Sequence, residues 1–123
     1  MASTDAPRRG EVWLVALGAG RAGELGKTRP AIVVSSDELS AGAPGALIVV
    51  VPLSSSLAPS ALWVDVAPMV GIDRPSRSVC RAVRAVVSAR FVRRIGSVDS
   101  ATMERMEQAL ALILGLELRS KPG

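Results

Sequence analysis

The chain has 123 residues, enough for one domain with a core of its own, and 49% of them are hydrophobic. The sequence has no histidine, which excludes a Ser-His-Asp triad, and its single cysteine, Cys80, excludes an internal disulfide. The net charge of +4 favours an acidic partner such as nucleic acid, although the same charge also serves solubility alone. With neither a signal peptide nor ~18 consecutive apolar residues, we expect a cytoplasmic protein without a membrane partner.

Apolar segments rich in β-branched residues predict strands along most of the chain, at residues 11–17, 30–35, 46–53, 62–66 and 91–95. A valine-rich segment, 79–87, is interrupted by two arginines. Loops are expected at 18–28, at 37–45 with one helical turn after Asp37, and at 70–78. Residues 1–8 are expected to form a flexible tail, and residues 9–118 a single domain.

The C-terminal part changes in character, because its apolar residues repeat at helical spacing. Asp99 is a candidate N-cap for a helix over residues 100–114, and Gly115 is a candidate C-terminal stop. One face of this helix carries Met103, Met106, Leu110, Ile113 and Leu114, and its methionines are expected to pack either in the core or in a dimer. Several short strands followed by one helix predict a mainly β fold, a small curved antiparallel sheet or barrel with the helix packed on it.

One stretch concentrates reactive groups. Glu24, Lys27, Thr28 and Arg29 stand directly before Pro30 and a buried strand, so a rigid element would hold them in place. Arg29 suits the binding of phosphate oxygens, because its planar guanidinium donates two parallel hydrogen bonds; an ion pair with Glu24 is the alternative. Ser54 directly follows the third predicted strand. Its hydroxyl is expected either to donate a hydrogen bond to a phosphate oxygen or to stabilise a turn.

Four motifs combine into one pattern: RGEVW at 9–13, TRPAIVVS at 28–35, VVPLSS at 50–55 and VRRIG at 92–96, before a helix that ends in LGL at 114–116. In order and spacing they resemble the MazF/PemK (Kid-like) toxins of bacterial toxin–antitoxin modules. The resemblance implies an SH3-like β-barrel with a C-terminal helix and a homodimer. It also implies a sequence-specific, metal-independent endoribonuclease for single-stranded RNA, which needs no cofactor, and a cognate antitoxin whose acidic, disordered tail occupies the RNA groove.

The resemblance also implies site residues. Arg29 and Ser54 match the catalytic positions of the family, and Glu24 lies in the loop where some members carry a contributing acid. Lys27, Thr28 and Ser55 flank these positions and are candidate RNA contacts. Where the family often has a DQIR-like motif, this chain reads Arg81-Ala82-Val83-Arg84. Arg77, Arg81 and Arg84 are therefore candidate contacts to the RNA backbone, or else a solvated face.

Two other functions compete with RNA cleavage. The same fold superfamily includes a toxin that binds and poisons DNA gyrase without being an enzyme, so the fold alone does not decide. An inactive relative that survives as an antitoxin-binding module is a further alternative. The presence of both Arg29 and Ser54 favours the enzyme, because a gyrase-binding toxin has no need of them.

Overall fold

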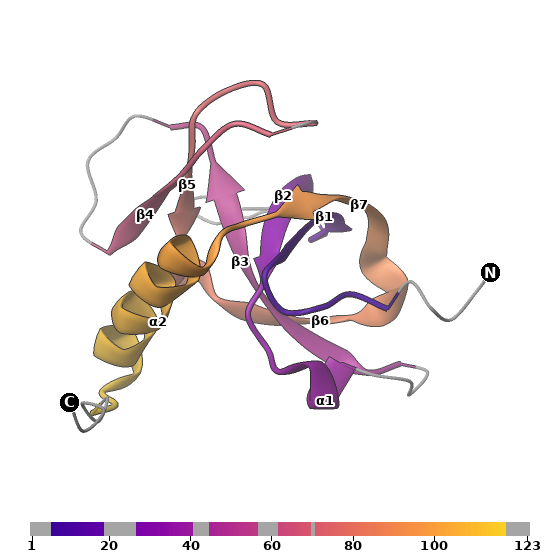
Figure 1. Ribbon diagram of the computed structural model, residues 1–123. Helices are drawn as coiled ribbons and strands as arrows, with labels where there is room; N and C mark the ends of the chain where they lie inside the picture. Colours follow the sequence, from indigo (N-terminus) through magenta and orange to yellow (C-terminus); the bar gives the residue numbers. More distant parts are fainter. Residues whose placement is uncertain (1–5, 19–26, 41–44, 57–61, 70, 118–123) are drawn as a thin grey trace.

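The computed structural model describes residues 6–18, 27–40, 45–56, 62–69 and 71–117. Its strands are β1 (Glu11–Ala16), β2 (Thr28–Val33), β3 (Leu47–Ser54), β4 (Trp63–Val66), β5 (Ser76–Val79), β6 (Arg84–Val87) and β7 (Phe91–Ser97). They form one curved sheet in the order β4-β5-β3-β2-β1-β7, and β6 pairs with the first half of β3 (Figure 1). All strand pairs in this sheet are antiparallel.

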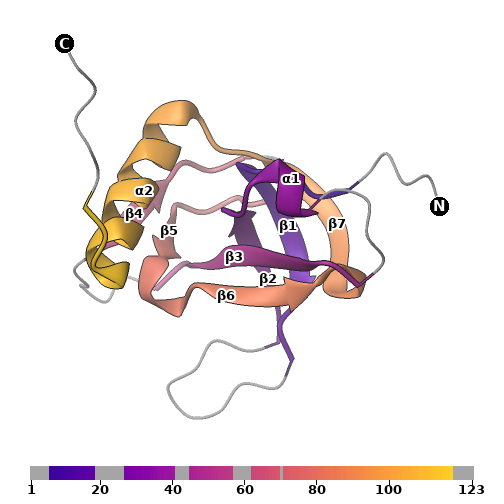
Figure 2. The same cartoon turned by 90° about the horizontal axis from the view of Figure 1, so that it is seen from below.

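The prediction of a mainly β fold with a C-terminal helix is confirmed. The sheet curves in the manner of a barrel, as the view in Figure 2 shows, but among the described strands β6 and β7 are not paired. Helix α1 (Asp37–Ser40) is the short turn expected after Asp37, and α2 (Ser100–Leu114) packs against β4 and the 3-10 turn η2 (Cys80–Ala82). No helix of the described chain is long and apolar enough to cross a membrane.

Two core clusters lie on opposite faces of the central strands. Neighbouring residues of one strand belong to different clusters, as Val12 and Trp13 do in β1 and Val50 and Val51 in β3. This alternation follows from the two-residue period of a strand. One cluster includes the fully buried Met106 of α2 and so joins the helix to the sheet, whereas the other is formed mainly by residues of β1, β2, β3 and β6.

The boundaries of α2 follow from local signals. The Asp99 side chain accepts a hydrogen bond of 2.8 Å from the Thr102 N–H, and Gly115 ends the helix with a left-handed φ of 69°. Met106 on the apolar face of α2 is fully buried, whereas Leu114 at the end of the same face is 59% exposed. Small residues of the first and third turns, Thr102 and Ala109, are buried beside Met106.

One sequence prediction for the third quarter of the chain is wrong in part. The expected loop over residues 70–78 ends early, because residues 76–78 belong to β5. The valine-rich segment 79–87 is divided, because η2 separates β5 from β6. The SRSV sequence of β5 has little intrinsic preference for the strand conformation. Pairing with β3 on one side and β4 on the other stabilises that conformation instead.

The N-terminal motif is a structural anchor. The Glu11 side chain, which is 16% exposed, accepts hydrogen bonds from the Arg8 N–H (2.7 Å) and the Trp13 indole (3.0 Å), and it pairs with Arg94 of β7 (2.8 Å). The Arg9 guanidinium donates to the Val34 carbonyl and pairs with Glu107 of α2. These contacts fasten the beginning of β1 to β2, β7 and α2.

The connection from β1 to β2 is closed by backbone hydrogen bonds. The Leu17 N–H donates to the Lys27 carbonyl at 2.8 Å, and the Lys27 N–H donates to the Gly18 carbonyl. Lys27 has a positive φ of 63° and Gly18 one of 86°, so the chain turns sharply on both sides of this closure. Thr28 then begins β2 directly.

Candidate functional site

The strand register aligns charged and hydroxyl side chains across the sheet. Ala31 of β2 lies opposite Pro52 of β3, and continuing this register by two residues brings Arg29 opposite Ser54. On the other side of β3, Ser54 lies opposite Arg77 of β5, which in turn lies opposite Asp65 of β4. Residues directly opposite each other share one face of a sheet, so these four residues form a single cross-strand row.

A hollow of about 210 Å³, here called the Arg29–Ser54 hollow, opens where β2 begins and β3 ends. Its lining includes three predicted site residues, Arg29, Ser54 and Ser55, so residues about 25 positions apart in the sequence meet at one rim of the sheet. The same hollow is also lined by Asp73 and Arg74, which come from the connection between β4 and β5 and are not among the predicted site residues. A guanidinium, a hydroxyl and a carboxylate at one hollow can hold a phosphate and move a proton.

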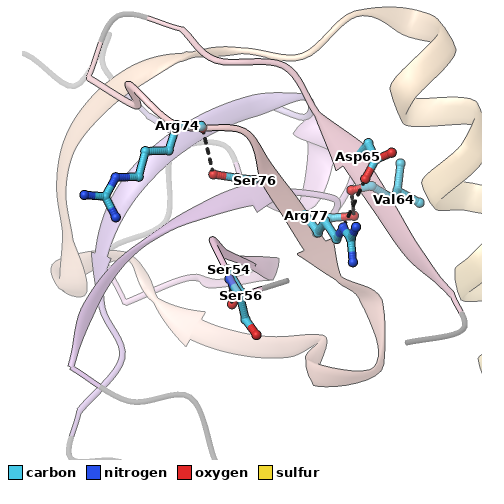
Figure 3. Close-up of polar contacts among 8 residues, drawn as sticks. Ser54, Ser56, Val64, Asp65, Arg74, Ser76 and Arg77 are labelled. Carbon is cyan, nitrogen blue, oxygen red and sulfur yellow. Dashed lines mark hydrogen bonds and ion pairs between the residues drawn. The ribbon is translucent and has the colours of Figure 1, made fainter. Parts of the chain in front are cut away.

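A second hollow of about 530 Å³, here called the Asp65–Arg77 hollow, lies between β4, β5 and the beginning of α2. Its lining shares Ser76 with the first hollow and includes Ser56, Asp99, Thr102 and Arg105. Arg77 pairs with Asp65 at 3.3 Å across this hollow. Figure 3 shows Ser54 and Ser56 together at the end of β3, Arg77 turned toward Asp65, and Arg74 extending away from that ion pair.

The remaining predicted site residues are placed less centrally. Lys27 and Thr28 are exposed immediately before Arg29, so they border the rim of the first hollow along the chain. Arg81 on η2 and Arg84 on β6 are exposed but line neither hollow. Glu24 lies outside the described residues, and its assignment stays a prediction.

The connection between β4 and β5 is fixed to the rest of the molecule, which makes Asp73 and Arg74 parts of a rigid rim. Met69 and Ile72 exchange two backbone hydrogen bonds of 3.0 and 2.8 Å, and Ile72 is buried in the core. Gly71 has a φ of 92°, and a Cβ there would lie 3.0 Å from Ile95 Cγ2 of β7. After Asp73, the Ser76 hydroxyl donates to the Arg74 carbonyl at 3.3 Å.

A signal in the sequence does point to Asp73 and Arg74. These two charged residues stand between Ile72 and Ser76, and the two flanking residues are buried. A short charged segment is held in place when the residues on both sides of it are buried. The burial of Ser76 is harder to predict from the sequence than that of Ile72, because serine is usually exposed.

Cys80 is fully buried and packs in the core as a small apolar residue. Burial raises the pKa of its thiol, and the hydrogen-bonding contact with Ser78 at 3.6 Å opposes that rise. Because the thiolate is the reactive form, this cysteine is chemically inert in the folded protein. Among the described residues, no three His, Cys, Asp or Glu side chains gather into a group that would hold a metal ion.

The comparison with protein families decides the identity of the fold. The family of PemK-like, MazF-like toxins of type II toxin–antitoxin systems matches residues 8–114. The chain belongs to this family. Among MazF-like proteins, endoribonuclease MazF9 of Mycobacterium tuberculosis is 34% identical over 115 residues, which are 89% of this chain and 97% of that protein.

Solved structures of MazF-like proteins share the fold. MazF from Deinococcus radiodurans superposes with a TM-score of 0.76 at 17% identity, covering 90% of this chain and 98% of that one. A mycobacterial endoribonuclease, solved in complex with its cognate antitoxin, gives a TM-score of 0.70 at 24% identity and covers 94% of this chain and 99% of that one. The predicted family and its mainly β fold are therefore confirmed.

Proposed function

We propose that this MazF-like toxin is a sequence-specific endoribonuclease that cleaves single-stranded RNA in the cytoplasm, with mRNA as the first candidate substrate and rRNA and tRNA as the others. The observation that carries the proposal is that Arg29 and Ser54, which are distant in the sequence, line one hollow at the rim of the sheet. The name endoribonuclease, which MazF9 of M. tuberculosis bears, favours RNA cleavage over the poisoning of a protein target such as gyrase.

The proposed reaction uses the 2′-hydroxyl of the RNA as the nucleophile on the adjacent phosphate. It yields a 2′,3′-cyclic phosphate and a 5′-hydroxyl, and it requires donors that stabilise the charge on the phosphate oxygens. Arg29 supplies a bidentate cation, and the Ser54 hydroxyl, opposite it across the sheet, donates to the same group. Glu24 stays a candidate for the general base, with an ion pair to Lys27 or Arg29 as the alternative.

The RNA strand is proposed to run along the rim from Lys27 and Thr28 past Ser55. Arg77 is proposed to contact the phosphate next to the scissile one, because it is the neighbour of Ser54 in the cross-strand row. Its pairing with Asp65 supports a fixed side-chain position rather than a mobile one. Arg81 and Arg84 are proposed as outer phosphate contacts that add affinity without reading the sequence.

Two protein partners complete the proposal. The first is a second copy of the chain, supported by a shallow apolar hollow on α2 and by the exposed leucines Leu112, Leu114 and Leu116. The second is a cognate antitoxin whose acidic, disordered tail occupies the RNA groove; the net charge of +4 supports an acidic tail as the partner.

The test is cleavage of a long single-stranded RNA of mixed sequence in the presence of EDTA, with mapping of the new ends. Arg29→Ala is expected to lower the rate about 10²–10³-fold, as the loss of one positioned donor does, while binding changes much less. Ser54→Ala acts in the same direction. Arg93→Ala is the matched control, because this exposed arginine of β7 lines neither hollow.

The outcome against the proposal is equally definite. If wild-type protein leaves RNA intact while it still arrests growth, the chain poisons another target. A substrate with deoxyribose at the mapped cleavage position must resist cutting. If that substrate is cut, the attack does not come from the 2′-hydroxyl.

A further inference from the structure

The proposed reaction needs a group that accepts the proton of the attacking 2′-hydroxyl, and this chain offers few such groups. Histidine is absent from the sequence, so a carboxylate is the next choice. Among the described residues that line the Arg29–Ser54 hollow, Asp73 is the only carboxylate. It stands within the same rim as the two residues proposed to hold the phosphate.

The other carboxylates of this part of the molecule are engaged elsewhere. Asp65 pairs with Arg77, and Asp99 caps α2 by accepting from the Thr102 N–H. Asp73, in contrast, is exposed and makes no hydrogen bond or ion pair within the described part of the chain. An exposed carboxylate that makes no contact of its own, and that lines one hollow with a guanidinium and a hydroxyl, is available to a ligand.

The backbone around Asp73 is fixed, as a proton-transferring group requires. The residue before it, Ile72, is only 7% exposed and is held by two backbone hydrogen bonds with Met69. The residue after it, Arg74, has its carbonyl bound by the Ser76 hydroxyl. Gly71 and Gly96 allow this connection to approach β7 closely, since a Cβ on Gly96 would lie 2.9 Å from Met69 Sδ.

We infer that Asp73 is the general base of the cleavage reaction, an inference that rests on the proposed function. The 2′-hydroxyl proton passes to a carboxylate oxygen of Asp73 as the 2′-oxygen bonds to phosphorus. The bond from phosphorus to the 5′-oxygen breaks, and that oxygen takes a proton from water to become the 5′-hydroxyl. Asp73 then returns its proton to water, and the products are the cyclic phosphate and the 5′-hydroxyl end.

The charges around the hollow suit this role. A carboxylate repels a phosphate unless cations separate their charges, and here Arg29 and Arg74 line the same hollow. Removing the charge of Asp73 therefore relieves repulsion of the substrate while it removes the proton acceptor. This gives the inference a signature that a structural or base-reading role would not share: cleavage falls while RNA binding stays equal or becomes tighter.

The experiment compares wild-type protein with Asp73→Asn, Asp73→Glu and the control Glu38→Gln. Glu38 is an exposed carboxylate on α1, at the opposite end of the molecule from the β4–β5 connection, and its substitution removes the same charge (Figure 1). The cleavage site is first mapped on a long RNA with wild-type protein. Single-turnover cleavage is then measured on a short RNA that spans the site, and binding on the same RNA with deoxyribose at the scissile position.

Asp73→Asn is expected to slow single-turnover cleavage about 10²–10⁴-fold, the usual contribution of a general base, with binding unchanged or tighter. Asp73→Glu is expected to recover part of the rate, and Glu38→Gln to match the wild type. Urea unfolding of Asp73→Asn checks that the fold is intact; if it is not, Asp73→Glu and Asp73→Ser replace it in the same comparison.

Three results overturn the inference. The first is that Asp73→Asn retains the wild-type rate within a few-fold; a loss of rate in Glu24→Gln then assigns the base to Glu24. The second is that binding falls in proportion to the rate, which makes Asp73 a contact to the RNA bases. The third is that Asp73→Glu is as slow as Asp73→Asn while both bind normally, which argues against proton transfer by a carboxylate. Absence of cleavage by the wild-type protein counts against the proposed function itself.

Discussion

Glu11 is expected to stabilise the fold more than any exposed ion pair of this protein does. Replacing Glu11 with alanine removes the acceptor of the Trp13 indole N–H, and Trp13 is only 7% exposed. A buried donor without a partner costs about 1–3 kcal/mol. The lost pair with Arg94, whose side chain is 54% exposed, adds only about 0–1 kcal/mol because water screens it.

These contributions predict that Glu11→Ala lowers the free energy of unfolding by about 1–4 kcal/mol. Urea titration at neutral pH, followed by circular dichroism and by tryptophan fluorescence, measures the change. Glu11→Gln, which keeps one oxygen acceptor for the indole, is expected to lose less than Glu11→Ala, and Arg94→Ala to lose no more than about 1 kcal/mol.

The reasoning about Glu11 is refuted if Glu11→Ala unfolds within about 0.5 kcal/mol of the wild type, the usual effect of a neutral surface substitution. It is also refuted if Arg94→Ala is as damaging as Glu11→Ala, because the ion pair and not the indole hydrogen bond would then dominate.

Three further predictions concern α2, the buried thiol and the rim. The hydrogen bonds that Asp99 accepts lower its pKa, so the ionised carboxylate stabilises the fold above its ordinary pKa, and this contribution is lost as the pH falls through the lowered value. Asp99→Ala is therefore expected to have a lower free energy of unfolding than the wild type at neutral pH. Urea titrations in acid are expected to show no such difference. Cys80 is expected to react with a thiol reagent orders of magnitude more slowly in native protein than in urea. Gly71→Ala and Gly45→Ala both place a side chain at positive φ, so each is expected to lower the free energy of unfolding by about 1–2 kcal/mol. Only at position 71 does the new Cβ contact Ile95, so only Gly71→Ala is expected to slow cleavage as well.

The strands and the helix were predictable where the signal is local. The apolar β-branched runs of β1 and β3 and the capping residues of α2 determine their own conformation, and the structure confirms them. The β5 strand was not predictable in this way, because SRSV has no apolar alternation and becomes a strand only between β3 and β4. Leu114 shows the same limit, since helical spacing alone does not say where the core ends.

The candidate site was predictable only in its separate parts. Arg29 and Ser54 each stand out at the end of an apolar run, but their meeting depends on the register between β2 and β3, which tertiary pairing sets. Asp73 is remote from both in the sequence, and only the packing of the β4–β5 connection against β7 brings it to the same hollow. The sequence therefore indicates the chemical groups, and the fold selects which of them meet.

The closure between Leu17 and Lys27 has an evolutionary consequence. Because backbone hydrogen bonds join Leu17 and Gly18 to Lys27, the two ends of the β1–β2 connection are held together next to Arg29. Doubling the length of a flexible connection costs only about 0.6 kcal/mol in chain entropy. We therefore expect related toxins to differ in the number of residues between positions 18 and 27, while the residues after position 27 keep the chemistry constant.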